Sequence, residues 1–296
     1  MACPPHVLTP HTQCNKTPWG PLKLASAIMH STLDSRLQLS CNVTAIDMDI
    51  ASLHHDAWVF MPEDPRAFEW HGEGWVIYND EFHQYRQMHM QRVLPTPLPS
   101  IPLSPPGGPD PHKPPDYQGI RKRWEKNWVA IGPTGTSIDD NDDYLFARRL
   151  EPHEIFRCSR QGTCRNESAT SHEAFFQSLL SQYQYIEFHL GTNAVRVSAT
   201  HYGAIMHGVT HPPKKRKHYD KWPYLFRAEA PYEIEQIASR PLELALPPGL
   251  PDDTVYANSL TFVDGLLVLS YSVENESICM HVDKADTVFK DMVPVT

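Results

Sequence analysis

Two acids and an arginine lie beside a proline in residues 63–66 (Glu-Asp-Pro-Arg), directly before an alternating apolar segment. A carboxyl group held partly out of water among aromatic side chains is suited to protonating a leaving oxygen. Trp70 and Trp75 supply aromatic surface nearby in the sequence. These residues therefore permit general acid catalysis by a carboxyl group. The alternative is an ion pair between Asp64 and Arg66 that only stabilises the fold.

The order of polar residue, alternating strand, turn and second strand recurs along the chain. The recurrences begin at positions 64, 127, 193 and 258, which are 63, 66 and 65 residues apart. Repeated meander units bury their sheet faces against one another around a central axis. The sequence therefore predicts an all-β fold, a five-bladed β-propeller with four clear blades and a first blade that is diverged or incomplete. An irregular all-β domain is the alternative.

The predicted elements divide the chain into two parts. Residues 1–56 are poorly patterned and are interpreted as a remnant of the first blade, with a β-prone stretch at 37–50. Residues 57–296 form the propeller domain, in which the proline-rich segment 94–118 is predicted to be an inserted surface loop. The best helical candidate is 173–182. The predicted strands are 66–70, 75–79, 87–93, 144–147, 154–157, 202–206, 224–228, 256–262, 266–271 and 277–282.

Composition excludes some classes of function. The net charge is −9, so a surface that neutralises nucleic-acid phosphates is not expected. No apolar run reaches the about 18 residues of a membrane span. The basic residues 214–217 and the acidic residues 139–143 are interpreted as solvated loops. The sequence shows no phosphate-binding glycine loop and no Cys-x-x-Cys pair.

Cysteines and sequons bear on the compartment. Cys158 and Cys164 bracket five residues, a short loop that a disulfide could close. Asn-x-Ser/Thr sequons, more than chance predicts, favour a secretory or Golgi lumen, although no signal peptide pattern is present. The sequons lie at Asn15, Asn42, Asn166 and Asn275. The sequence therefore does not decide the cellular compartment.

Basic and histidine side chains recur at corresponding edges of the repeated units. Arg66, Lys126 and His207 occupy such edges, so a propeller would bring them toward one axis. Arg196 and His153 are further candidates for the mouth of this axis. A phosphate, or the diphosphate of a sugar nucleotide, needs several converging donors. A surface position is the alternative for Lys126, and a buried packing role is the alternative for His207.

Three segments carry a resemblance to a known family. Residues 63–66 resemble the Glu-Asp-Pro-Arg signature of the β-mannoside phosphorylases, which are five-bladed β-propellers. Residues 202–209 look like their strand that ends in Tyr-His-Gly-Val, with Met206 replacing the tyrosine, and residues 264–273 look like their last blade. Residues 125–128 and 151–153 are more similar to transferase-like propeller relatives, which include β-mannosyltransferases. The resemblance covers roughly residues 58–290, and the family's first blade is not recognisable.

The resemblance implies roles for particular residues. Asp64 would be the general acid, and phosphate would attack the sugar. Glu63 would hydrogen-bond a sugar hydroxyl or cap its strand. Substrate or phosphate would be bound by Arg66, Lys126, His153, Arg196 and His207. The implied partners are a carbohydrate acceptor and a phosphate or sugar-nucleotide donor, with no cofactor and no metal.

We therefore expect a carbohydrate-active enzyme that transfers or cleaves a glycosyl unit, β-mannosyl by resemblance. The sequons and residues 125–128 favour a glycosyltransferase over a glycoside phosphorylase or hydrolase. A non-catalytic propeller that binds glycans or a protein is the alternative, because the first blade is not recognisable. A metal-dependent transferase using Asp47 and Asp49 is a third hypothesis, but the strand-rich sequence offers little helix for its nucleotide-binding half.

Overall fold

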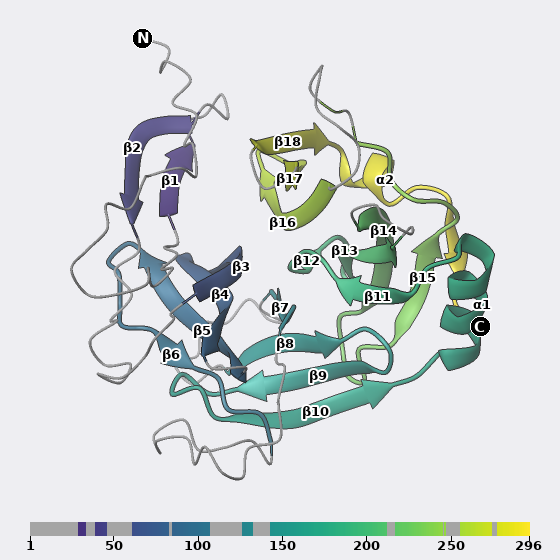
Figure 1. The fold of residues 1–296 in the computed structure, drawn as a ribbon, viewed down its shortest axis with the longest axis horizontal. Helices are drawn as coiled ribbons and strands as arrows, with labels where there is room; N and C mark the ends of the chain where they lie inside the picture. Colours follow the sequence, from purple (N-terminus) through teal and green to yellow (C-terminus); the bar gives the residue numbers. More distant parts are fainter. Residues whose placement is uncertain are drawn as a thin grey trace, which may run out of the picture.

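The described part of the chain is an antiparallel β-propeller. The structure is a computed structural model that describes residues 29–33, 39–45, 61–82, 85–106, 126–132, 143–211, 217–244, 246, 255–273 and 277–296. Four sheets stand around a common centre, with β3, β7, β12 and β16 nearest to it (Figure 1). The all-β class and the propeller architecture are therefore confirmed, with four blades in the described residues.

The first two blades each have four strands in sequence order. The first blade contains β3 (Met61–Trp70), β4 (Glu73–Phe82), β5 (Tyr85–Leu94) and β6 (Ile101–Pro102). The second contains β7 (Val129–Ile131), β8 (Tyr144–Arg149), β9 (His153–Cys158) and β10 (Cys164–Thr170). Each innermost strand thus begins close to one of the repeated polar positions.

The third blade is the largest, and the chain returns to complete it. Its strands are β11 (Glu187–Leu190), β12 (Val195–Arg196), β13 (His201–Thr210), β14 (His218–Arg227), β15 (Ile234–Ala238) and β19 (Met292–Pro294). The fourth blade has β16 (Val255–Val263), β17 (Leu266–Val273) and β18 (Ser277–Asp283), and the short helix α2 (Ala285–Val288) leads from it to β19. Because β19 pairs with β15, the last described strand fixes the third blade to the fourth.

A separate hairpin precedes these blades. Strands β1 (Met29–Leu33) and β2 (Leu39–Ala45) form a two-stranded sheet. Figure 1 places this hairpin in the sector between the fourth and the first blades. Strand β2 falls within the β-prone stretch predicted at 37–50. Five blades are not established by this hairpin.

Two tight turns explain why the hairpins close where they do. Asp264 and Gly265, between β16 and β17, have φ of 50° and 79°. His71 and Gly72, between β3 and β4, have φ of 49° and 77°. Positive φ at both central residues is typical of the type I′ turn, whose twist matches that of the flanking strands. The two turns therefore close the β3–β4 and β16–β17 hairpins.

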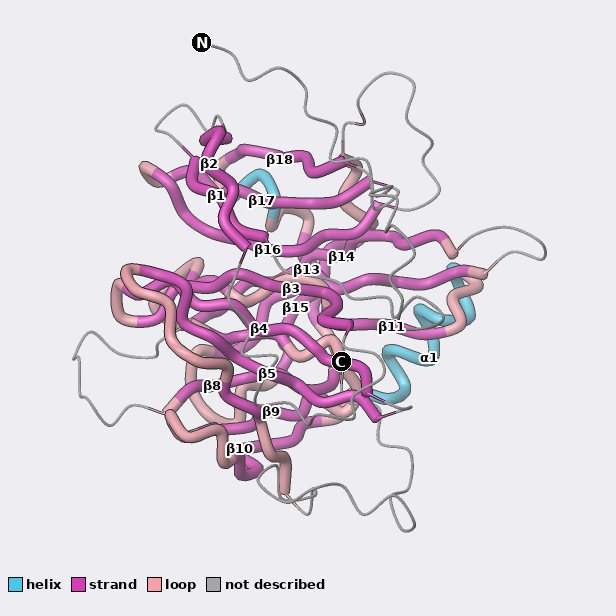
Figure 2. The backbone as a smooth tube through the Cα atoms, turned by 60° about the vertical axis from the view of Figure 1, so that its left-hand side comes forward, coloured by secondary structure: helices cyan, strands magenta, loops and turns pink. Residues whose placement is uncertain are grey.

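Aromatic side chains fill the space between the first two blades. Trp70, Trp75 and Trp128 are at most 4% exposed and pack in one cluster with Phe146 and Phe156. The Trp128 and Phe156 rings meet edge to face at 5.2 Å. The tryptophans thus join blades rather than offering a surface on which a sugar could stack. Figure 2 shows β16–β18 and β8–β10 on opposite sides of the molecule, with β3 and β13 between them.

Outside the strands, two predictions agree with the structure and one differs. Helix α1 (Glu173–Tyr183) matches the helix predicted at 173–182, and Cys158 and Cys164 form the predicted disulfide. The proline-rich segment was expected to be a loop only, yet β6 pairs with β5 and Leu103 is buried. Backbone pairing and one apolar side chain suffice to dock this part; residues 107–118 lie outside the described residues. The boundary at 56/57 stays a prediction.

Candidate active site

The guanidinium of Arg66 lies at the centre of the propeller, and the residue is only 1% exposed. Its Nε donates to the carbonyl of Gly191 at 2.6 Å, and its Nη1 donates to the carbonyl of Asp64 at 3.2 Å. Its Nη2 donates to Asn127 Oδ1 at 3.2 Å and to the Tyr256 hydroxyl at 2.9 Å. One acceptor comes from each of the four blades. This side chain therefore joins them, and its hydrogen bonds make a buried charge tolerable.

Asp64, two residues before Arg66, is exposed. The register between β3 and β4 shifts between Glu63 and Arg66, and Asp64 has φ of 52°. Aspartate adopts this left-handed conformation more readily than most residues. The irregularity lets the arginine point into the centre while the acid stays accessible. Asn127, at the corresponding position of the second blade, has φ of 61°.

The charge of Asp64 affects two tyrosines of other blades, Tyr256 and Tyr219. Burial raises the pKa of Tyr256 to about 12; the charge of Arg66 opposes this rise and the charge of Asp64 adds to it. Burial also raises the pKa of Tyr219, and the carboxylates of Asp64 and Glu187 raise it further. The two tyrosine rings are 5.3 Å apart. Tyr219 therefore stands within electrostatic reach of two carboxylates, one from the first blade and one from the third.

Strand β11 supplies Glu187 and His189 to a polar cluster at this mouth. The Nε2 of His189 lies 3.0 Å from Glu187, and Lys217 Nζ lies 3.5 Å from the same carboxylate. Burial lowers the pKa of His189; the bond to Glu187 opposes this, and the charges of Lys126 and Lys217 lower it further. Burial would raise the pKa of Glu187, but its bond to His189 and the nearby cations hold it below the usual value. Glu187 is thus a carboxylate at neutral pH.

His207 is buried on β13, beside the centre. Its Nε2 accepts a hydrogen bond from the backbone N–H of Ala257 at 3.0 Å, so Nδ1 carries the proton. Its ring lies 4.1 Å from that of Tyr256. Burial, followed by the charges of Arg66, His189 and Lys221, lowers the pKa of His207 well below its usual value. His207 is therefore neutral near pH 7 and offers no charge to an anion.

His153 and Arg196 make other contacts. His153 is 1% exposed; its Nδ1 donates to the carbonyl of Tyr232 at 2.8 Å, and its ring packs 5.1 Å from that of Phe226. Burial lowers the pKa of His153 to about 4. Arg196 is exposed and donates to the carbonyl of Ala199 at 2.7 Å. These contacts place His153 between the second and third blades, and Arg196 at the end of β12 with its side chain against the turn that leads to β13.

The structure thus brings Asp64, Arg66 and His207 together at the centre, and Lys126 directly precedes Asn127, which accepts a hydrogen bond from Arg66. Glu63 pairs with Asn79 through its backbone, and its side chain lies outside the described part of the molecule. Sequence reasoning missed Asn127 and Tyr256 as partners of Arg66, although both belong to the repeated openings. It also missed a second group near the mouth, formed by Glu187, His189 and Tyr219. The available signal was the alternation of polar and apolar residues at 187–190, which includes Glu187 and His189.

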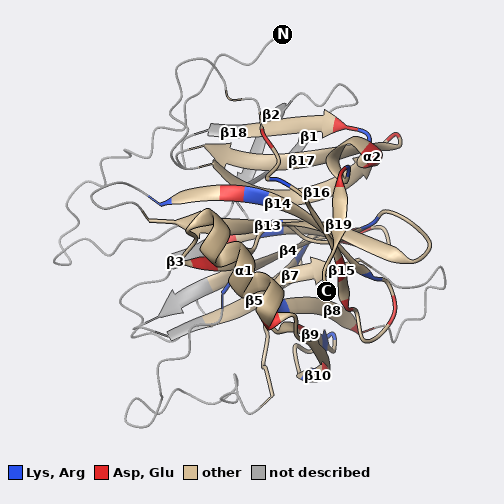
Figure 3. Ribbon diagram, turned by 90° about the vertical axis from the view of Figure 1, so that its right-hand side faces the viewer, with Lys and Arg blue, Asp and Glu red and all other residues tan. Residues whose placement is uncertain are grey.

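Charges are interspersed over the strands in the view of Figure 3 rather than gathered on one basic face. Among the described residues, no group of three or more His, Cys, Asp or Glu side chains is arranged to hold a metal ion. Asp47 and Asp49 lie outside these residues. None of the helices within the described ranges has the length and apolar character to cross a membrane.

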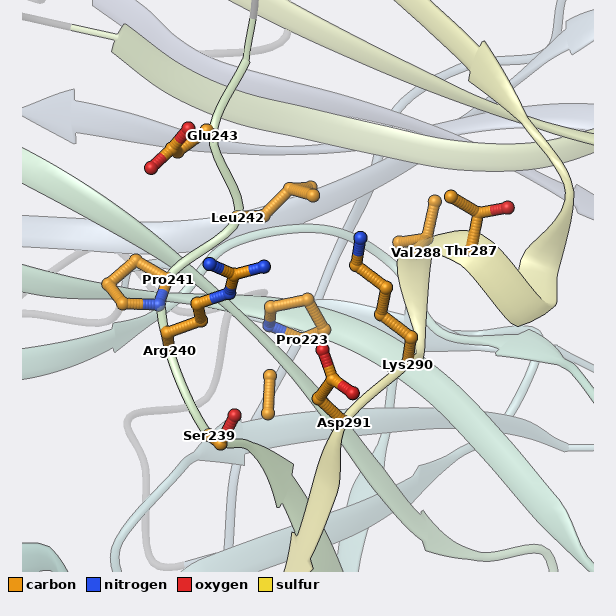
Figure 4. Close-up of a pocket in the computed structure, with 11 residues that line it drawn as sticks. Pro223, Ser239, Arg240, Pro241, Leu242, Glu243, Thr287, Val288, Lys290 and Asp291 are labelled. Atoms are coloured by element: carbon orange, nitrogen blue, oxygen red, sulfur yellow. The ribbon is translucent and has the colours of Figure 1, made fainter.

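A separate cavity of about 240 Å³ lies where the segment after β15 meets the segment between α2 and β19. Arg240 and Lys290 stand on facing walls of this cavity, with Asp291 and Pro223 at its side (Figure 4). None of the predicted site residues lines it. The candidate catalytic groups therefore belong to the propeller mouth and not to this cavity.

Comparison with known proteins gives a fold but not a family. No protein-family model matches the chain, and no curated protein matches it. One solved structure aligns with a TM-score of 0.59. Its description says that the GH130 family of mannoside phosphorylases contains glycoside hydrolases that target β-1,2 mannosidic linkages in Candida mannan. The identity is 11%, over 90% of this chain and 78% of that chain. A glycosyl hydrolase from Bacteroides ovatus aligns with a TM-score of 0.54 and 12% identity, over 79% of this chain and 68% of that chain. At such identities the likeness shows the propeller fold that these proteins share.

Proposed function

We propose that this protein is a glycoside-cleaving enzyme whose active site lies at the propeller mouth, with Asp64 as the general acid. The observation that carries the proposal is the contrast within one short segment. Arg66 is buried and held by all four blades, whereas Asp64 is exposed two residues earlier. A catalytic acid needs this combination of access to substrate and a rigid support.

Glu187 is the proposed partner of Asp64. Most glycoside-cleaving enzymes use two carboxyl groups, one that protonates the leaving oxygen and one that activates water or attacks the sugar. Both carboxylates raise the pKa of Tyr219, which supports a position of Glu187 near Asp64. Glu187 is ionised and is fixed by His189 and Lys217. We assign it the task of activating water.

Phosphate is the competing nucleophile. Lys217 lies 3.5 Å from Glu187, and Lys126 directly precedes Asn127. These cations support a binding site for an anion at the mouth, even though Arg66 and His207 are enclosed. The proposed substrate class is a β-mannoside, because of the resemblance in residues 63–66 and the name of the GH130 neighbour. A sugar nucleotide would serve as donor if the enzyme were a transferase.

The test is turnover of β-1,2-linked mannobiose by the wild type, Asp64→Asn and Glu187→Gln, each with and without inorganic phosphate. Hydrolysis predicts free mannose without phosphate and a loss of rate in both variants. If mannose 1-phosphate forms, and only in the presence of phosphate, the reaction is phosphorolysis and not hydrolysis. Equal rates in wild type and Asp64→Asn would contradict the assignment of the acid. Turnover of sugar nucleotides alone would favour the transferase, and glycan binding without turnover would favour a binding propeller.

We also infer that the β1–β2 hairpin belongs to a fifth blade. Its support is the sector that it occupies and its antiparallel pairing, as in the other blades. Removal of residues 1–56 would then expose the inner faces of the first and fourth blades. A truncated chain that melts at the temperature of the full chain would contradict this inference.

A further inference from the structure

Asn166 lies on the outer rim of the propeller. It belongs to β10, which ends the second sheet and pairs there only with β9 among the described strands, apart from the bridge between Thr163 and Ser104 (Figure 1). The residue is exposed, and within the described part of the chain its side chain makes no hydrogen bond. The amide is therefore accessible and is not used by the fold.

A register shift follows Asn166 directly. Asn166 pairs with Phe156 and Ser168 pairs with Ile155, so Glu167 is an extra residue in β10. The side chain of Glu167 forms a two-point ion pair with Arg157 at 2.7 and 2.9 Å. This pair fixes the bulge, and no other described strand pairs with the edge of β10 at this point.

The hydroxyl of Ser168 donates and accepts no hydrogen bond among the described residues, and its Oγ is buried. An unpaired buried hydroxyl is unfavourable, so packing alone gives no reason for serine at this position. Thr170 Oγ1 is also unpaired, but threonine suits a strand through its branched side chain. Asparagine followed two residues later by serine is the acceptor sequence for N-linked glycans.

The same hairpin contains the Cys158–Cys164 disulfide, which closes the β9–β10 connection. Disulfides persist in oxidising compartments, which include the lumen where N-linked glycans are added. The disulfide is an observation independent of the sequon, and both indicate the same environment. An exposed edge strand is prone to pair with other chains, and a glycan on it would block such pairing.

We propose that Asn166 is an N-glycosylation site and that its glycan covers the free edge of β10. In the transfer, the side-chain amide nitrogen of Asn166 forms a bond to C1 of an oligosaccharide carried on a lipid diphosphate. The bond between C1 and the diphosphate oxygen breaks, the lipid diphosphate leaves, and the amide gives up one proton to a base of the transferase. No electron transfer is involved. The glycan points outward from the rim and leaves the propeller mouth open.

The first test is mass spectrometry of the protein isolated from the cells that make it. Enzymatic removal of an N-linked glycan converts the modified asparagine to aspartate, so the expected result is this mass change at position 166 after deglycosylation in heavy-oxygen water. An unmodified Asn166 overturns the proposal, whether or not other sequons carry glycans.

The second test uses matched variants of the full chain expressed through a eukaryotic secretory pathway. Asn166→Gln and Ser168→Ala should each lose the glycan at position 166, whereas Ser168→Thr should keep it. Because the Ser168 hydroxyl is unpaired, Ser168→Ala should fold as the wild type does, judged by its circular dichroism. A glycan at position 166 in Ser168→Ala, or its loss in Ser168→Thr, contradicts the assignment.

Discussion

The interface between the first two blades and the centre of the propeller both hold sheets together, but by different means. At the interface, Trp70, Trp75 and Trp128 pack with phenylalanines in a cluster that contains few polar atoms. At the centre, Arg66 donates four hydrogen bonds in four directions. Apolar packing depends mainly on volume, whereas a hydrogen-bonded charge depends on the direction of each donor.

Asn193 extends the same contrast. Its Oδ1 accepts from the backbone N–H of Leu260 at 2.8 Å and from Ser259, and its Nδ2 donates to the Leu260 carbonyl at 2.9 Å. This side chain thus fastens the third blade to the fourth, as Arg66 fastens all four. The centre should therefore tolerate conservative replacement poorly, and the interface should tolerate it well.

The largest expected effect is that of Arg66→Lys. A lysine keeps the charge, but one ammonium group cannot reach four acceptors that lie in a fan around a guanidinium. We expect the free energy of unfolding to fall by about 3–5 kcal/mol, measured by chemical denaturation. Arg92→Lys is the matched control, because Arg92 is only partly buried in its pair with Glu73 and should cost less than about 1 kcal/mol. Equal losses in the two variants would contradict the contrast.

Acid should weaken the fold through two buried histidines, His89 inside the first blade and His153 between the second and third blades. Burial lowers the pKa of His89 and of His153 to about 4, from 6.5. Because the folded pKa lies below the unfolded one, the unfolded chain takes up protons first. The contribution of these neutral histidines to the free energy of unfolding is therefore fully present above about pH 6.5. It is lost as the pH drops toward 4, by roughly 3 kcal/mol for each histidine.

The matching variant is His89→Gln, which removes one of these titrations. Its free energy of unfolding should fall less steeply than that of the wild type between pH 6.5 and 4. The measurement is a series of denaturation curves at different pH values. An unchanged slope would show that His89 does not titrate in this way.

Trp128→Phe should have a smaller effect than Arg66→Lys. Trp128 is fully buried against Phe146 and Phe156, and phenylalanine keeps most of the apolar contact. We expect a loss of about 1–2 kcal/mol in the free energy of unfolding. A loss as large as that of Arg66→Lys would mean that the interface is as exacting as the centre.

Asp64→Asn should have the smallest effect on stability. The residue is exposed, and asparagine adopts the left-handed backbone at this position as readily as aspartate. The free energy of unfolding should change by less than about 0.5 kcal/mol. A larger loss would favour a structural role for the carboxylate.

The sequence predicted the repeated strand–turn–strand units, but little of which side chains meet at the centre of the propeller. The spacing of positions 64, 127, 193 and 258 indicated the blades, because period-two alternation and turn residues are local signals. It could not show that Arg66 turns inward while Asp64 turns outward, since that depends on a register shift and a positive φ. Glu187 was missed because its neighbours come from elsewhere in the chain: Tyr219 belongs to β14, and Lys217 directly precedes that strand.

The family resemblance treated residues 63–66 as one charged unit facing substrate. The structure divides that unit into a support and an exposed acid. His153 and Arg196 were assigned to the mouth from sequence position alone, which cannot distinguish a rim from an interface between blades. Their roles in binding substrate stay predictions, and their contacts offer no support for them.

The central claim, that Asp64 protonates the leaving group, is tested most directly by comparing two substrates of Asp64→Asn. One is a β-mannoside with a sugar leaving group, and the other has an activated aryl leaving group that departs without a proton. If Asp64 is the general acid, kcat/KM should fall by about 10²–10⁴-fold on the first substrate and by much less on the second. Equal losses on both substrates would contradict a general acid role for Asp64.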